Sequence, residues 1–351
     1  MRIFAGYQRG VNLGGWLSQC ESMEEAHFES FIQKEDIARI ASWGLDHVRL
    51  PIDCDVVFAD ELGTPHARMR YVDDCVAWCG QYGLNVVLDL HKTFGYMFDR
   101  AVVPDPDAFF RDEALQDAFF RMWRTLASRY GSLADRVAFE LLNDVTNPAQ
   151  AQNWNRIARQ AIAEIREIAP DTYILVGGVN HNSVTRVTLL DPPTDDRIVY
   201  NFHCYEPLVF THQTAGWVDG MPADFSIAYP NTMGAYRQAA DRLHIWQADD
   251  VSPEDASMIG PQYYENLFRE AIDYAERMNV PLYCGEYGVI DQVPPADAVN
   301  WYRDIHHVFV KHGIGRSAWS YKRMNFGLAD AHYDDVRIRS ESTRLNSSHA
   351  R

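Results

Sequence analysis

The sequence predicts a single (β/α)8 TIM barrel, an α/β fold, with an insertion after the sixth strand. Three observations support this fold: eight short apolar, β-branched segments recur along the chain, amphipathic segments separate most of them, and polar residues gather at their C-terminal ends. Alternating strands and helices imply a parallel sheet, and eight repeats close a barrel. A doubly wound open sheet is the alternative, but no GxGxxG or P-loop motif opens the first helix.

The predicted strands, in chain order, are residues 10–13, 47–52, 85–91, 137–144, 172–178, 197–205, 281–288 and 315–322. The predicted helices have apolar residues three and four positions apart, at residues 36–43, 72–82, 115–130, 154–169, 263–278 and 296–312. Residues 206–261 are longer than the usual βα loop and rich in aromatic residues. We expect an ordered insertion over the C-terminal end of the barrel, where loops build active sites; a passive insertion is the alternative.

A catalytic barrel is predicted over residues 1–339. Residues 340–351 lack the apolar period of a barrel-closing helix and look like a non-native tail. The N-terminus has no apolar segment typical of a signal peptide, so the default location for the chain as given is the cytoplasm, and secretion applies if a signal was removed.

Composition restricts the class of partner. The net charge of −17 argues against a nucleic acid or an anionic membrane and suits a neutral substrate. The six cysteines are scattered through 351 residues, which predicts buried free thiols and no disulfide framework. Aromatic residues make up 13% of the chain; most should pack in the core, and the rest suit sugar-stacking platforms. We expect a monomer.

Polar side chains gather at the C-terminal ends of the predicted strands. They are Arg49 on the second strand, Asp89 and His91 on the third, Asn143 and Asp144 on the fourth, His203 and Tyr205 on the sixth, Glu286 on the seventh and Trp319 on the eighth. Barrel strands are otherwise apolar, because helices cover one face and side chains fill the other. Charged groups in such positions are costly unless they are paired, so their clustering indicates a functional site.

Two carboxylates on facing strands, Asp144 and Glu286, suit glycoside cleavage. One protonates the leaving oxygen while the other attacks the anomeric carbon or activates water. Arg49 is expected to keep Glu286 ionised, Tyr205 to hold its second oxygen, and Asn143 to bind a sugar hydroxyl.

Other interpretations of these residues exist. Arg49 could simply pair with a core carboxylate, and His91 could be a satisfied core histidine. The spacing of Asp89 and His91 is also seen in metal sites, but no further histidines follow at strand ends in a suitable pattern, so we predict no metal and no cofactor. A Ser–His–Asp triad is excluded because no nucleophile-elbow motif is present.

Seven motifs together resemble glycoside hydrolase family 5, and within it the compact bacterial endoglucanase C type. They are GVNLGGW (10–16), HVRLP (47–51), VLDLH (87–91), FELLN (139–143), YNFHCY (200–205), YCGEYG (283–288) and AWSY (318–321), joined by FTHQTAGW (210–217) inside the insertion. The resemblance extends from about Phe4 to Leu328 and is more specific for the family than for the substrate.

The resemblance implies a retaining double displacement on β-1,4-glucan without a cofactor. Glu286 would be the nucleophile, supported by Arg49 and Tyr205. The subsite beside the cleaved bond would be lined by His91, Asn143 and His203, with Trp319 as its stacking floor. Further candidates for substrate contact are Trp16, Lys92, Phe94, His212, Trp217 and Asn325.

Two positions depart from the family pattern. The family places Glu directly after the Asn of the fourth strand, where this chain has Asp144, and Lys92 replaces a frequent His. A shorter carboxylate should weaken the acid/base step. An engineered change, a natural variant with a compensating loop shift, and a non-catalytic glucan-binding protein all remain open. Within the enzyme class, a mannanase or β-1,3-glucanase is also possible.

Overall fold

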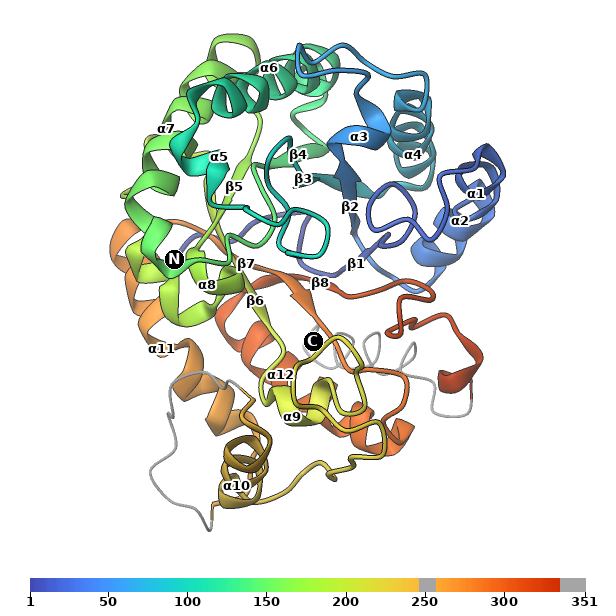
Figure 1. Cartoon of the computed structure of the whole chain (residues 1–351), viewed down its shortest axis with the longest axis vertical. Coiled ribbons are helices and arrows are strands. Elements are labelled where there is room, and N and C mark those ends of the chain that lie inside the picture. The colour runs from blue at the N-terminus through green and yellow to red at the C-terminus, as the bar shows by residue number, and fades with distance from the viewer. Residues whose placement is uncertain (246–256, 335–351) are drawn as a thin grey trace, which may run out of the picture.

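The computed structural model describes residues 1–245 and 257–334. Eight parallel strands form a closed barrel in chain order, as predicted (Figure 1). They are β1 (Gly10–Asn12), β2 (His47–Asp53), β3 (Asn85–Lys92), β4 (Val137–Glu140), β5 (Ile174–Gly177), β6 (Ile198–Cys204), β7 (Leu282–Tyr287) and β8 (Gly315–Ala318). The pairing of Gly10 in β1 with Ser317 in β8 closes the ring.

All six predicted helices are present, each beginning one to three residues earlier than expected. They are α2 (Lys34–Ser42), α4 (Met69–Tyr82), α6 (Glu113–Tyr130), α7 (Ala151–Ile168), α11 (Pro261–Met278) and α12 (Pro295–His312). The early starts follow from capping: for example, Gln33 and Asp36 form a capping box at α2, and the Asp112 side chain accepts from the backbone at the start of α6.

Short elements complete the chain. The remaining helices are α1 (Glu25–Ser30), α3 (Cys54–Val57), α5 (Ala108–Arg111), α8 (Val179–Asn182), α9 (Leu208–Thr211) and α10 (Met233–Leu243). The 3-10 helices are η1 (Gly131–Leu133), η2 (Pro148–Gln150), η3 (Val184–Leu189) and η4 (Ala331–Tyr333). No helix among the described residues is long and apolar enough to cross a membrane. All six cysteines are free thiols, and five are buried; Cys20 is half-buried.

The interior of the barrel has an apolar layer beneath a polar one. Val87, Ala138 and Val199 belong to a small buried cluster with Phe4, Tyr7, Leu175 and Tyr283. Two residues further along the same strands come Asp89, Glu140 and Asn201, all fully buried. Because side chains two positions apart on a strand point to the same face, the polar layer lies on the C-terminal side of the apolar one. Charge is thus concentrated at the end where a barrel builds its active site.

Two predicted strands, 137–144 and 315–322, extend four residues too far. β4 ends at Glu140, and β8 ends at Ala318. Asp144 has a φ of 40°, a left-handed conformation that no strand contains. Asn143, Asp144 and Trp319 are therefore loop residues that follow the strands. The conformation of these loops decides where the three side chains lie.

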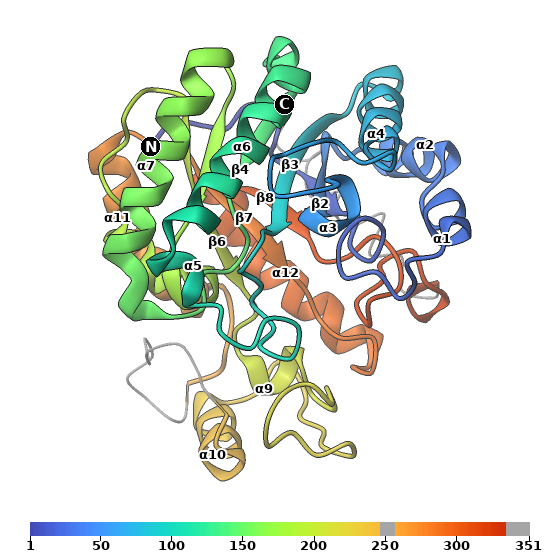
Figure 2. The ribbon, with the colours of Figure 1, turned by 45° about the horizontal axis from the view of Figure 1, so that its top comes forward.

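The insertion places α9 and α10 on one side of the barrel, with α9 near α12 in both views (Figures 1 and 2). The backbone N–H of Ile290, after β7, donates to the carbonyl of Thr211 over 2.9 Å, and the Thr211 hydroxyl donates to the carbonyl of Tyr205. These contacts attach the first part of the insertion to the strand ends. Residues 246–256 of the predicted insertion and the predicted tail, 340–351, lie outside the described residues.

Candidate active site

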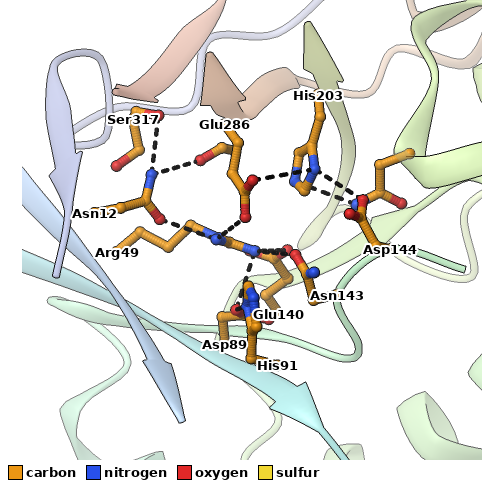
Figure 3. A network of polar contacts seen from close by, with 12 residues as sticks. Asn12, Arg49, Asp89, His91, Glu140, Asn143, Asp144, His203, Glu286 and Ser317 are labelled. Carbon is orange, nitrogen blue, oxygen red and sulfur yellow. Dashed lines mark hydrogen bonds and ion pairs between the residues drawn. The ribbon is translucent and has the colours of Figure 1, made fainter. Parts of the chain in front are cut away.

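Arg49 lies at the centre of a buried polar cluster inside the barrel (Figure 3). Its Nε and Nη2 donate to the two oxygens of Glu140, each over 2.7 Å. Nη1 donates to Oε1 of Glu286 over 2.9 Å, and Nη2 is 3.0 Å from Oδ2 of Asp89. Burial opposes a charged guanidinium, but these three carboxylates raise the pKa of Arg49 above its usual value. Arg49 therefore pairs with a core carboxylate and with Glu286 at once.

Amide side chains fix the orientation of this arginine. Asn12 and Asn143 each present Oδ1 to Arg49 at 2.9 Å. Asn201 donates to Oε1 of Glu140 over 2.8 Å and accepts from the backbone of Gly285, next to Glu286. A planar guanidinium with so many directed hydrogen bonds has little freedom to rotate, so it positions the carboxylate of Glu286 rigidly.

Glu286 projects from β7 with both oxygens hydrogen-bonded. Oε1 accepts from Arg49, and Oε2 accepts from the Tyr205 hydroxyl over 2.9 Å. Burial, together with the Glu286 charge, raises the pKa of Tyr205, so its hydroxyl stays protonated and remains a donor. The predicted contact of Tyr205 with the second carboxylate oxygen is present.

Asp144 is bound to a histidine. His203 Nδ1 lies 3.0 Å from Oδ1 of Asp144 and 3.8 Å from Oε2 of Glu286. Burial opposes ionisation of Asp144, but the charge and hydrogen bond of His203, with smaller contributions from His181 and His91, lower the pKa of Asp144 to about 2. Burial likewise disfavours the charged form of His203, but the charges of Glu286 and Asp144 raise its pKa. Both shifts favour an ion pair between a deprotonated Asp144 and a protonated His203.

His91 and Trp319 lie together beside this cluster. The His91 ring is stacked on Trp319 with centroids 5.8 Å apart and planes 12° apart, and its Nδ1 is 2.6 Å from Oδ2 of Asp89. Trp319 is 6% exposed. His91 is buried, as expected if it were a core histidine with satisfied hydrogen bonds. Its partner Asp89 also contacts Arg49, so His91 belongs to the same network as Glu286.

Glu140 and Asn12 are in the central network, but the sequence analysis does not single out either of them. The alternation of side chains along the strands could have identified Glu140. Val87 and Ala138 are inward-facing apolar residues, and Asp89 and Glu140 follow each of them by two positions. A fully buried carboxylate at such a position requires a partner, and Arg49 is the fully buried cation nearby.

The further candidates for substrate contact lie on two sides of the Arg49 cluster. On the insertion side, the His212 ring is 5.0 Å from Tyr205 and 6.3 Å from Trp217, whose side chain is 56% exposed. Asn325 is exposed next to Phe326, whose ring is 5.2 Å from His212. At the end of β3, Lys92 pairs with Asp55 over 2.7 Å, and Phe94 is half-buried against the core.

The prediction that Trp16 binds substrate is wrong. Trp16 is fully buried, its indole N–H donates to the carbonyl of Phe28 over 2.9 Å, and its ring is stacked on Trp78. Gly14, two residues before it, lets the loop pass close to Trp319, because a Cβ on Gly14 would lie 2.8 Å from the ring of Trp319. The GGW motif brings the loop after β1 close to the site, while its tryptophan anchors that loop in the core.

A closed (β/α)8 barrel with two acidic residues and a fixed arginine at its C-terminal end is the arrangement expected of a barrel glycoside hydrolase. The sequence model of cellulase (glycosyl hydrolase family 5) matches residues 8–325. The chain belongs to this family.

Curated relatives and solved structures agree with this membership. Cellodextrinase A of Ruminococcus flavefaciens is 41% identical, covering 89% of this chain and 84% of the relative. Endoglucanase C of Acetivibrio thermocellus is 34% identical, covering 92% of this chain and 93% of the relative. A hyperthermophilic endo-β-1,4-glucanase crystallised with substrate superposes with a TM-score of 0.72 at 21% identity, covering 93% of this chain and 92% of that one. This last similarity concerns the fold alone.

Proposed function

We propose that this chain is a retaining glycoside hydrolase that cleaves internal β-1,4 bonds of cellulose-like glucans, with Glu286 as nucleophile and Asp144 as an attenuated acid/base. The main supporting observation is that His203 Nδ1 lies 3.0 Å from Asp144 and 3.8 Å from Glu286. The two oxygens it contacts can then be at most about 7 Å apart, which suits the retaining separation of roughly 5–5.5 Å better than most of the inverting range of roughly 6.5–9.5 Å.

The mechanism has two displacements. Glu286 attacks the anomeric carbon while Asp144 gives its proton to the departing glycosidic oxygen, which breaks the C–O bond and leaves a glycosyl ester on Glu286. Asp144 then takes a proton from water, whose oxygen attacks the same carbon and releases Glu286. The Asp144–His203 ion pair slows both steps, because a carboxyl group with a pKa of about 2 is rarely protonated and is a weak base.

Relatives support the substrate class. They are named cellodextrinase and endoglucanase, so short cellodextrins and longer β-1,4-glucans are both substrates under this proposal. The catalytic unit proposed is a monomeric barrel of residues 1–339, with the insertion bordering the cleft. It acts on a neutral glucan, without a nucleic acid or membrane partner, in keeping with its net charge of −17.

An aryl cellobioside with a good leaving group tests the reaction. Such a substrate needs little protonation, so we expect a burst of about one aryl group per protein followed by slow turnover, with the β-anomer as the first product. Mass spectrometry of the intact protein should show the glycosyl adduct during turnover. Carboxymethylcellulose should be cleaved faster than mannan or β-1,3-glucan.

A second candidate function is glucan binding without cleavage, which the ion pair between Asp144 and His203 favours. It differs in the same assay, because a binding protein shows affinity for cellodextrins with neither a burst nor an adduct. An α-anomeric first product would contradict the retaining mechanism.

Trp217 provides a test of the insertion. Its exposed ring lies near His212 and Phe326, so it is placed to stack on a sugar beyond the cleavage point. In the inactive Glu286→Gln background, replacing it by Ala should weaken binding of cellohexaose by about five- to tenfold and leave cellobiose binding nearly unchanged. Titration calorimetry gives both constants, with Tyr82→Ala, an exposed aromatic residue at the end of α4, as control. Equal losses for both ligands would remove the role in the cleft.

A further inference from the structure

Gln19, which no motif of the sequence analysis includes, lies beside the site. It is in the loop after β1 with a φ of 51°, a left-handed conformation that is uncommon for glutamine. Its backbone N–H donates to Oδ2 of Asp53 over 3.0 Å, and the neighbouring Leu17 forms a bridge with Ile52. These contacts hold the loop against the end of β2. Residues in such conformations cluster at functional sites, and the side chain of Gln19 extends toward His91.

The amide of Gln19 meets the one ring nitrogen of His91 that faces away from the buried network. Nδ1 of His91 is bound to Asp89, while Nε2 is 3.0 Å from Nε2 of Gln19. The ring itself is fixed by stacking on Trp319 and by the edge-on contact of Phe98. Gln19, which is half-exposed, is therefore the polar residue that contacts His91 on the side away from the buried network.

The amide has unused hydrogen-bonding capacity. Only one of its groups is engaged by His91, and no residue within 1–245 or 257–334 donates a hydrogen bond to its Oε1. A half-buried amide with a free acceptor and a second N–H matches two adjacent hydroxyls of a pyranose, one donating and one accepting. The loop is already ordered by its contacts with β2, so binding costs little conformational entropy.

We propose that Gln19 is a sugar-binding, specificity-determining residue that hydrogen-bonds hydroxyl groups of the glucosyl unit next to His91 and Trp319. This inference rests on the proposed function. It differs from a positioning role, in which Gln19 would only orient the His91 ring.

The test uses Glu286→Gln as an inactive background and cellotriose as probe. Adding Gln19→Leu, similar in size but without polar atoms, should raise the dissociation constant about tenfold, whereas adding Gln160→Leu on the exposed face of α7 should not change it. If the background variant binds no cellotriose, the proposed function fails. If it binds and Gln19→Leu binds equally well, only the inference about Gln19 fails.

Glycosides lacking single hydroxyls separate contact from positioning. In the Glu286→Gln background, at least one monodeoxy cellobioside should bind several-fold more weakly than its parent, and that difference should disappear when Gln19→Leu is added. If every deoxy penalty is the same with and without Gln19, the residue touches no hydroxyl and the proposal is overturned.

Discussion

Replacing Glu286 by Gln is expected to lower the hydrolysis of cellodextrins by roughly 10⁴-fold or more, in keeping with the loss of other catalytic nucleophiles. An amide oxygen is too poor a nucleophile to form the glycosyl ester, so even a good aryl leaving group cannot rescue the reaction. That feature distinguishes Glu286 from Asp144, whose loss should matter least for such leaving groups.

Binding should largely survive the same change. Gln is isosteric with Glu, and Arg49 keeps Glu140 and Asp89 as charged partners, so the guanidinium is not left unpaired. Stopped-flow measurement of aryl release and calorimetry with cellotriose give the two quantities. Glu265→Gln, in an ion pair on α11 with Lys311, is a matched control that should remain active. Substantial aryl release by Glu286→Gln would refute the assigned nucleophile.

The barrel could be predicted from sequence because the patterns that indicate its strands and helices are local ones. Each strand is a short β-branched segment and each helix an amphipathic one, and family motifs fall at nearly every strand end. The placement of Arg49, Tyr205 and Glu286 follows directly, since parallel strands bring their C-terminal ends together.

The errors arise where tertiary contacts decide. Whether Trp16 faces a cleft or the core depends on α1, whose Phe28 carbonyl accepts its indole N–H, and local sequence gives no information on that contact. β4 ends at Glu140, where its pairing with β3 and β5 stops, and the left-handed Asp144 lies in the loop that follows; Asp adopts this conformation more readily than most residue types. Gln19 belongs to no pattern at all, because only the fold brings it to His91.

Position 144 is the point at which sequence and structure together predict the largest gain of function. Replacing Asp144 by Glu should raise the hydrolysis of carboxymethylcellulose by about a hundredfold, because the added methylene moves the carboxyl group roughly 1 Å toward the glycosidic oxygen. The longer side chain also changes the tight pairing with His203, which holds the pKa of Asp144 at about 2. A carboxyl group with a higher pKa is protonated more often near neutral pH and is a better proton donor.

The gain should depend on the leaving group. Carboxymethylcellulose and cellodextrins need full protonation of a sugar oxygen, so they should gain most, whereas the burst with an activated aryl cellobioside should change little. Asp304→Glu, which lengthens a carboxylate on α12 that pairs with Tyr229, is the control for non-specific effects. A gain on one polymer identifies residue 144 as the acid/base and also names the substrate. No gain on any polymer would make glucan binding without cleavage the better interpretation, because the acid/base would then be displaced by more than one methylene can restore.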